Sequence, residues 1–290
     1  MAEPDAEVDL TVGLVRDLLR EQHPDLATLP IVEVASGWDN IVFRLGEDLA
    51  IRLPQRAMGA LLAVNEERWL AELAPGLPLP VPAPVRVGAP GMGYPWLWSV
   101  VPWFPGEEAA VADPTDWGDT AERLGAFLAA LHCPAPSDAP VNPYRGVPLA
   151  DRAARLAEGL DGLGDQVDRS QIEAQWAALV ATPAWTGPPL WLHGDLHPRN
   201  LVVHRGRLAA VVDFGDMTAG DPATDLSVAW FWLPASVRSA FREAYGGADE
   251  DTWQRGKGWA LALAVAHLGG DERVIPLGRR ALDAVLAEDG

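Results

Sequence analysis

The spacing of apolar positions separates the chain into two stretches of different character. In residues 10–21 the apolar side chains stand at positions 10, 14, 15, 18 and 19, which is the spacing of one helical face. Short apolar runs bounded by turn residues follow and predict strands. The expected elements of this first stretch are a helix at 10–21, strands at 31–35, 40–45, 49–53, 85–88 and 96–101, and a helix at 56–73. They predict a lobe built on a small antiparallel sheet.

Helical spacing dominates the second stretch. The segment PWFPGE (102–107) predicts a linker, because its two prolines and glycine disfavour regular structure. The helices expected beyond it lie at 116–132, 149–160, 168–181, 222–232, 234–245, 250–267 and 278–287. We therefore predict an α+β chain of two lobes, residues 1–102 and 103–290, with a cleft between them.

Two motifs stand close together in the second stretch. HGDLHPRN (193–200) is followed by VVDFGD (211–216), and the apolar runs at 201–204 and 208–216 predict two strands joined by the turn Arg205-Gly206-Arg207. Such a hairpin returns Asp213 to the neighbourhood of Asn200.

The polar residues of these motifs match the needs of phosphoryl transfer. A kinase-type site needs a carboxylate that receives the proton of the attacking hydroxyl, plus an amide and a second carboxylate that hold Mg²⁺ on the phosphates. Asp195, Asn200 and Asp213, at spacings of 5 and 13 residues, supply these groups. Mg²⁺ keeps several waters and phosphate oxygens, so one amide and one carboxylate suffice.

These motifs, with DPATDL (221–226), resemble those of the aminoglycoside phosphotransferase family, the small-molecule relatives of protein kinases. The resemblance extends upstream and covers about residues 30–232. Its upstream segments are SGWDN (36–40), LAIRLP (49–54), EERWLAELA (66–74) and WSVVPWFPGE (98–107). It implies a bilobal protein-kinase-like fold whose first lobe binds ATP or GTP and whose second lobe carries the catalytic groups.

Several residues of the first lobe are expected to hold the nucleotide. The turn SGWDN, with Ser36, Gly37 and Asn40, can cover phosphates with its backbone N–H groups. The backbone from Ser99 to Val101 is expected to pair with the base. The choice between ATP and GTP stays open.

Arg52 stands where kinases usually carry a lysine, and the only lysine in the chain is Lys257. An arginine can hold phosphate oxygens well, although the two side chains are not interchangeable. We expect Arg52 to grip the phosphates and to pair with Glu66, with Glu67 as the alternative, because Glu66 falls on the cleft side of the helical pattern.

Charge and composition bear on partners and on location. The net charge of −19 argues against a nucleic-acid or anionic-membrane partner. It suits a cationic substrate, or it serves solubility alone. The single cysteine, Cys133, excludes an internal disulfide, and no apolar run reaches the length of a membrane span. With an acidic start in place of a signal peptide, we expect a cytoplasmic protein.

The acceptor is expected to be a small hydroxylated molecule. Only seven residues separate Asp213 from Asp221, which leaves no room for a peptide-docking segment. An aminoglycoside-type antibiotic is the first guess; a macrolide, a cellular metabolite and a catalytically silent nucleotide-binding module are the alternatives. Asp221 and Asp225 are expected to serve a helix N-terminus, with Asp221 also a candidate to face the substrate. Candidate pocket walls, weighed against simple core packing, are Trp230, Phe231, Trp232, Trp253 and Trp259 with Asp249, Glu250 and Asp251.

Overall fold

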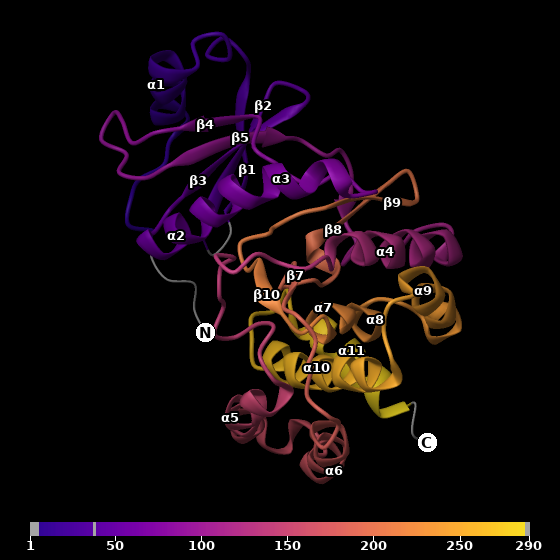
Figure 1. The fold of residues 1–290 in the computed structure, drawn as a ribbon. Helices are drawn as coiled ribbons and strands as arrows, with labels where there is room; N and C mark the ends of the chain where they lie inside the picture. The colour runs from indigo at the N-terminus through magenta and orange to yellow at the C-terminus, as the bar shows by residue number, and fades with distance from the viewer. Residues whose placement is uncertain (1–5, 37–38, 288–290) are drawn as a thin grey trace.

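The computed structural model describes residues 6–36 and 39–287, which form two lobes (Figure 1). The N-terminal lobe holds a five-stranded antiparallel sheet with the strand order β1-β2-β3-β5-β4. Its strands are β1 (Ile31–Ser36), β2 (Asn40–Leu45), β3 (Leu49–Pro54), β4 (Arg86–Gly88) and β5 (Trp98–Pro102). Gly37 of the predicted phosphate-covering turn lies outside the described residues.

The sheet follows from tight turns and alternating burial. β2 and β3 are joined at Gly46, whose φ of +65° is a left-handed conformation that favours glycine. Alternate residues of these strands, such as Phe43 and Ile51, are buried against α1 (Val12–Gln22). The side chain of Thr11 caps α1 by accepting a hydrogen bond from the backbone of Leu14 at 3.2 Å.

The helical run after β3 connects the two lobes. The sequence predicts one helix at 56–73, whereas the structure divides the run into α2 (Ala57–Asn65), a π-helical turn (Glu66–Leu70) and α3 (Ala71–Leu73). Trp69 of the π turn packs on Trp191 of the second lobe, with ring centroids 5.1 Å apart. The widened turn therefore brings an aromatic side chain of the first lobe into the core of the second.

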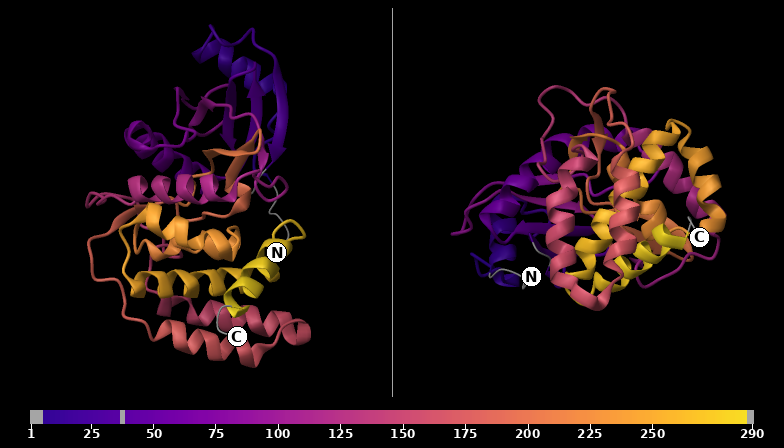
Figure 2. Two further views of the ribbon diagram at one scale, coloured as in Figure 1. Left: turned by 90° about the vertical axis from the view of Figure 1, so that its right-hand side faces the viewer. Right: turned by 90° about the horizontal axis from the view of Figure 1, so that it is seen from below.

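The C-terminal lobe is mainly helical, with α10 running through its centre and α5 and α6 beneath it (Figures 1 and 2). Its helices are α4 (Trp117–Leu131), α5 (Ala153–Leu163), α6 (Arg169–Val180), α7 (Ala223–Leu226), α8 (Val228–Phe231), α9 (Arg238–Tyr245), α10 (Glu250–Leu268) and α11 (Ile275–Ala287). A 3₁₀ turn, η3 (Leu149–Arg152), precedes α5, and another, η5 (Pro198–Asn200), follows the HGD motif.

Short strands lie near the junction of the lobes. β6 (Glu107–Glu108), β8 (Leu201–His204) and β9 (Arg207–Val211) form one sheet, and β7 (Leu190–Leu192) pairs with β10 (Thr218–Gly220). The predicted strand at 208–216 is therefore too long, because the chain leaves the sheet after Val211. β6, β7 and β10 were not predicted, since strands of two or three residues show no periodic pattern.

The aromatic residues proposed as pocket walls pack in the core instead. Each exposes 7% of its surface or less, and they are Trp230, Phe231, Trp232, Trp253 and Trp259. Helical spacing brings these rings together on the inner faces of α8 and α10, where burial of apolar area stabilises the lobe. For these rings the structure supports core packing, the alternative that the sequence left open, although Nε1 of Trp232 and Nε1 of Trp259 have no hydrogen-bond acceptor among the described residues.

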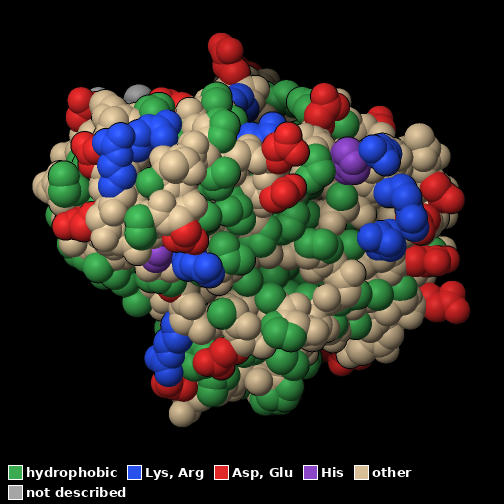
Figure 3. All heavy atoms as spheres, turned by 90° about the horizontal axis from the view of Figure 1, so that it is seen from above, with side chains coloured by type: hydrophobic (Ala, Val, Ile, Leu, Met, Phe, Trp, Pro, Cys, Tyr) green, Lys and Arg blue, Asp and Glu red, His purple; other side chains and the backbone are tan. Residues whose placement is uncertain are grey.

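The surface carries charges of both signs. Seen from above, hydrophobic side chains occupy much of the middle of the face, with acidic and basic side chains interspersed around them (Figure 3). No helix in the described ranges is both long enough and apolar enough to cross a membrane. The α+β class and the two-lobed architecture predicted from the sequence are confirmed.

Candidate active site

The loop that follows β7 is held rigidly by one buried carboxylate. The backbone N–H groups of His193 and Gly194 donate to Asp225 at 2.7 and 2.9 Å. Gly194 has a φ of +86°, and a Cβ atom there would lie 2.2 Å from the carbonyl oxygen of Asp216. Only glycine fits this position, so the HGD motif places Asp195 at a fixed point of the loop.

Asp225 itself sits in a buried polar network. His132, the residue that caps α4, lies with Nε2 3.2 Å from a carboxylate oxygen of Asp225 and with Nδ1 2.8 Å from the hydroxyl of Tyr245. Asp225 is fully buried. The sequence predicted a structural role for Asp225, and its contacts agree with that role.

The hairpin connects Asn200 by hydrogen bonds to Asp195 and to the residue that precedes Asp213. Asn200 Nδ2 donates to the backbone carbonyl of Asp195 at 2.8 Å, and Val212 N donates to the backbone carbonyl of Asn200 at 2.9 Å. His193 Nε2 lies 2.9 Å from the carbonyl oxygen of Val212. The catalytic loop and the DFG segment are thus hydrogen-bonded to each other, as the predicted hairpin required.

Asn200 and Asp213 offer oxygen atoms suited to a hard dication. The Asn200 amide nitrogen is occupied by Asp195, which leaves Oδ1 as its ligand-type atom. Asp213 is half exposed and adopts a left-handed φ of +62°, which is rare for a residue other than glycine and is common at functional sites. An amide oxygen and a carboxylate oxygen are ligands that suit Mg²⁺ completed by phosphate oxygens and water. No group of three or more His, Cys, Asp or Glu within the described ranges could hold a metal ion by itself.

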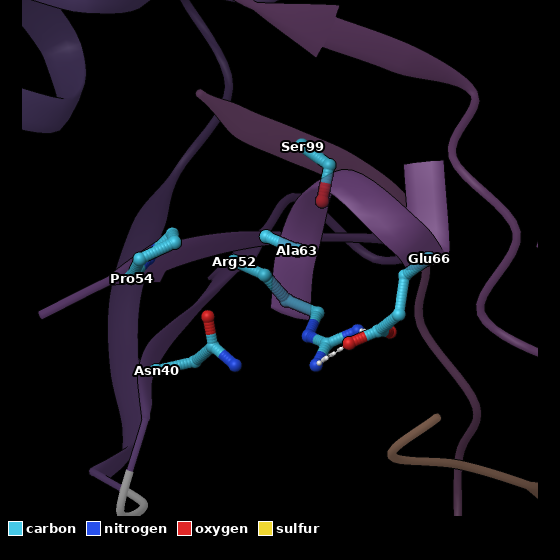
Figure 4. A pocket seen from close by; sticks show the side chains of 6 residues that line it. All are labelled: Asn40, Arg52, Pro54, Ala63, Glu66 and Ser99. Atoms are coloured by element: carbon cyan, nitrogen blue, oxygen red, sulfur yellow. Dashed lines mark hydrogen bonds and ion pairs between the residues drawn. The ribbon is translucent and has the colours of Figure 1, made fainter. Parts of the chain in front are cut away.

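Arg52 and Glu66 form a largely buried ion pair in the N-terminal lobe (Figure 4). Arg52 Nη2 donates to Glu66 Oε1 at 3.0 Å, and Nη1 bonds the second carboxylate oxygen. Burial lowers the pKa of Arg52, but the Glu66 carboxylate more than offsets this and raises it above its ordinary value. The same guanidinium lies 3.8 Å from Asp213 Oδ1, which brings the β3 arginine to the DFG carboxylate.

A small pocket surrounds this pair. Asn40, Ser99, Pro54 and Ala63 line it together with Arg52 and Glu66. In Figure 4, Arg52 extends from β3 toward Glu66, with Asn40 and Ser99 on the flanking strands. Four of the residues predicted to contact nucleotide are therefore brought together.

The two ends of the predicted base-binding segment differ in how β5 is paired. Ser99 is paired on both sides, with Arg52 of β3 and Val87 of β4, so its backbone belongs to the sheet. Val101 pairs with Ala50 of β3 and lies beyond the last β4 pair.

Asp195 contacts two basic side chains, those of Arg145 and His197. Neither contact was predicted from the sequence. Arg145 Nη2 donates to its Oδ1 at 2.8 Å, and His197 Nε2 lies 3.3 Å from its Oδ2. Burial raises the pKa of Asp195, but the charges of His197 and Arg145 outweigh burial and hold the pKa well below its usual range. Asp195 is therefore a carboxylate at neutral pH and can accept a hydrogen bond from an acceptor hydroxyl.

Arg145 belongs to a loop that is fastened to β10. Asn142 N donates to Thr218 Oγ1 at 3.0 Å, and the backbone of Gly146 exchanges hydrogen bonds with Thr224 Oγ1 and Asp221 N at 3.1 and 3.0 Å. Sequence reasoning missed Arg145, because it lies 50 residues from Asp195 in an irregular segment. No spacing rule links the two positions.

Asp221 does not face the substrate. Its side chain exposes 3% of its surface and binds Arg255 Nε at 2.7 Å and Nη2 at 3.3 Å. The expectation that Asp221 faces the acceptor is therefore wrong, because both of its carboxylate oxygens accept hydrogen bonds from Arg255 inside the lobe. Asp249 likewise serves as the N-cap of α10, accepting from Thr252 N at 2.8 Å.

The sequence matches the phosphotransferase enzyme family over residues 30–259, which is most of the chain. The protein therefore belongs to this family. This confirms the resemblance drawn from the motifs and the prediction of a phosphotransferase with an alcohol group as acceptor. Among proteins of curated function, none matches this sequence.

Solved structures of similar fold cover almost the whole chain. Aminoglycoside 2'-phosphotransferase-IIIa in its GDP complex is 18% identical, with a TM-score of 0.70 over 95% of this chain and 98% of that chain. Macrolide 2'-phosphotransferase MphH from Brachybacterium faecium is 22% identical, with a TM-score of 0.62 over 94% and 97%. The streptomycin–ATP complex of APH(2")-IIa is 18% identical, with a TM-score of 0.61 over 93% and 95%.

Proposed function

We propose that the protein transfers the γ-phosphate of ATP or GTP to a hydroxyl group of a small molecule, with Mg²⁺. The observation that carries this proposal is the convergence of Asp195, Asn200 and Asp213: Asn200 bonds Asp195, and the DFG segment is bonded to Asn200. Solved structures of similar fold are described with GDP or with ATP, which supports a nucleotide donor.

Each residue of the site has a distinct role in this proposal. Asp195 orients the acceptor hydroxyl and receives its proton at a carboxylate oxygen, which aligns the attacking oxygen with the phosphate. Arg52, held by Glu66, binds phosphate oxygens of the nucleotide. Asn200 Oδ1 and the Asp213 carboxylate hold the cation, which neutralises charge on the phosphates when it is bound.

The remaining nucleotide contacts come from the sheet. Asn40 and the Ser99 side chain line the pocket beside Arg52, and Ser36 and Gly37 belong to the turn expected over the phosphates. We propose that the base pairs with the backbone at Val101, because that residue extends past the β4 ladder whereas Ser99 is paired on both sides.

The acceptor class is the open part of this proposal. Aminoglycosides are the first candidates, since the relatives of similar fold include aminoglycoside phosphotransferases, and macrolides and hydroxylated metabolites follow. The test is a transfer assay with purified protein, Mg²⁺ and radiolabelled ATP or GTP across these acceptors. Nucleotide binding without transfer to any acceptor would favour a silent module.

A further inference from the structure

Three buried N–H donors of the loop before η3, of η3 and of α10 have no hydrogen-bond acceptor among the described residues. They are Nε of Arg145, Nε of Arg152 and Nε1 of Trp259. The guanidinium carbon of Arg152 lies 5.4 Å from the centroid of the Trp259 ring, and the charge of Arg145 is close enough to lower the pKa of Arg152. The three donors come from separate elements, namely the loop before η3, η3 itself and α10, and Arg145 is the one that contacts Asp195.

Arg152 is the least expected of these residues. It exposes only 6% of its surface, and no carboxylate within the described ranges pairs with it. Burial, together with the nearby charges of Arg145 and Arg155, lowers its pKa to about 10. A buried cation without an anion is costly, so an unpaired buried arginine calls for a reason.

Arg255 of the same lobe is a buried arginine that does have a carboxylate partner. It exposes 3% of its surface and makes two hydrogen bonds to the carboxylate of Asp221, at 2.7 and 3.3 Å. Arg152 and Arg255 are buried to a similar extent. They differ in that Arg255 is bound to a carboxylate and Arg152, within the described ranges, is not.

We propose that Arg152, Trp259 and Arg145 form an oxyanion-binding subsite that takes a carboxylate or phosphate group of the acceptor. This inference rests on the proposed function and narrows its acceptor. All three groups can only donate hydrogen bonds. Arg145 is paired with Asp195 and Asp216, whereas the positive charge of Arg152 has no carboxylate partner within the described ranges. Water could satisfy the hydrogen bonds but not the charge, whereas an oxyanion satisfies both.

The position of the subsite explains what it does for the reaction. Arg145 reaches Asp195 through Nη2 at 2.8 Å, while its Nε is left without a partner. An oxyanion bound at Arg152 and at the Nε of Arg145 places the rest of the acceptor beside the carboxylate that receives the hydroxyl proton. At the rim, Arg155 stacks over the half-exposed ring of Tyr144 at 4.3 Å and adds a third positive charge.

The charge of the subsite disfavours the first-guess acceptor. An aminoglycoside brings ammonium groups, which the unpaired guanidinium group of Arg152 repels. Hydroxy acids, sugar acids and phosphorylated alcohols carry the opposite charge together with a free hydroxyl. We therefore expect the accepted substrates to come from these anionic compounds.

Thermal unfolding of the full-length protein with and without inorganic phosphate tests the subsite without any activity. Phosphate should raise the Tm of the wild type by more than it raises that of Arg152→Met. Phosphate bound at Arg52 would stabilise both proteins, so only a difference between them reports on Arg152. Without phosphate, Arg152→Met should unfold no earlier than the wild type, because it removes an uncompensated charge.

The matched control is Arg255→Met, which removes an equally buried but paired arginine. It should lower the Tm clearly, since it leaves Asp221 buried without a partner. An Arg152→Met protein that is destabilised as much as Arg255→Met, or an equal phosphate effect in wild type and Arg152→Met, would overturn the subsite.

An acceptor panel tests the substrate class. Hydroxy acids and phosphorylated alcohols are compared with neutral sugars and aminoglycosides. The KM of an accepted anionic compound should rise about 10- to 100-fold in Arg152→Met, and Arg152→Lys should recover part of this loss. Transfer confined to neutral or cationic acceptors would overturn the acceptor class. A wild type that neither binds nor uses nucleotide would instead refute the proposed function. The comparison of Tm values with and without phosphate needs no nucleotide and would still test the subsite.

Discussion

Arg145 Nη2 lies 2.8 Å from Oδ1 of Asp195, although 50 residues separate the two along the chain. The contact exists because the loop that carries Arg145 is hydrogen-bonded to β10 and α7. It occupies one oxygen of the carboxylate proposed to receive the acceptor proton. An acceptor hydroxyl must therefore share Asp195 with a fixed positive charge, and this charge favours the ionised form of the carboxylate.

Replacing Asp195 by alanine should abolish phosphate transfer and leave nucleotide affinity nearly intact. The side chain touches the acceptor side, and losing both the orientation of the hydroxyl and its proton acceptor should reduce kcat by at least about 10²–10⁴-fold. Steady-state transfer and nucleotide Kd are the two measurements. Asp161→Ala, an exposed carboxylate paired with Arg169, is the control and should change neither. Near wild-type turnover in Asp195→Ala would show that the assignment is wrong.

Asp213→Asn should raise the Mg²⁺ concentration needed for half-maximal rate, and by more than Asn200→Ala does. An anionic oxygen contributes more than a neutral amide to the binding of a hard dication. The rate is measured against Mg²⁺ at saturating nucleotide for both variants. Equal and mild effects would move the metal site to other residues.

Arg52→Ala should weaken nucleotide binding strongly, while Arg52→Lys should retain part of it. A guanidinium can contact Glu66 and phosphate oxygens together, whereas an ammonium group supplies the charge as a single point. Loss of a charge-assisted contact in a partly closed cleft should cost about 1.5–3 kcal/mol of binding free energy. Calorimetric Kd values for nucleotide decide the matter, and unchanged values in Arg52→Ala would exclude this residue as the phosphate clamp.

Asp225→Ala should destabilise the protein more than any surface change. The backbone N–H groups of His193 and Gly194 would lose their acceptor in a buried site, at about 1–3 kcal/mol for each donor. The free energy of unfolding is measured in urea, with Asp161→Ala as the exposed control, which should lie within about 0.5 kcal/mol of the wild type. An equal stability of both variants would show that Asp225 does not hold the catalytic loop.

The pairing of Arg52 with Glu66 illustrates what local pattern can predict. The helical spacing placed Glu66 on the cleft side and Trp69 toward the core, and the structure has both there even though a π turn interrupts the helix. The same reasoning went wrong at Asp221, where the N-terminal position on a helix was visible but Arg255 was not. A buried ion pair between residues 34 positions apart leaves no periodic trace in the sequence.

The sequence by itself determined the two-lobed fold, the helices and the longer strands, and it supplied the three polar residues proposed to form the phosphotransferase site. These features are local: they follow from apolar spacing, turn residues and a motif in which the chemistry lies within about twenty positions. Only the tertiary structure decided that Arg145 pairs with Asp195, that Asp221 is buried against Arg255, and that Arg152 and Trp259 keep donors without acceptors. The reason is physical, because such contacts depend on how distant segments pack and on which charges that packing removes from water.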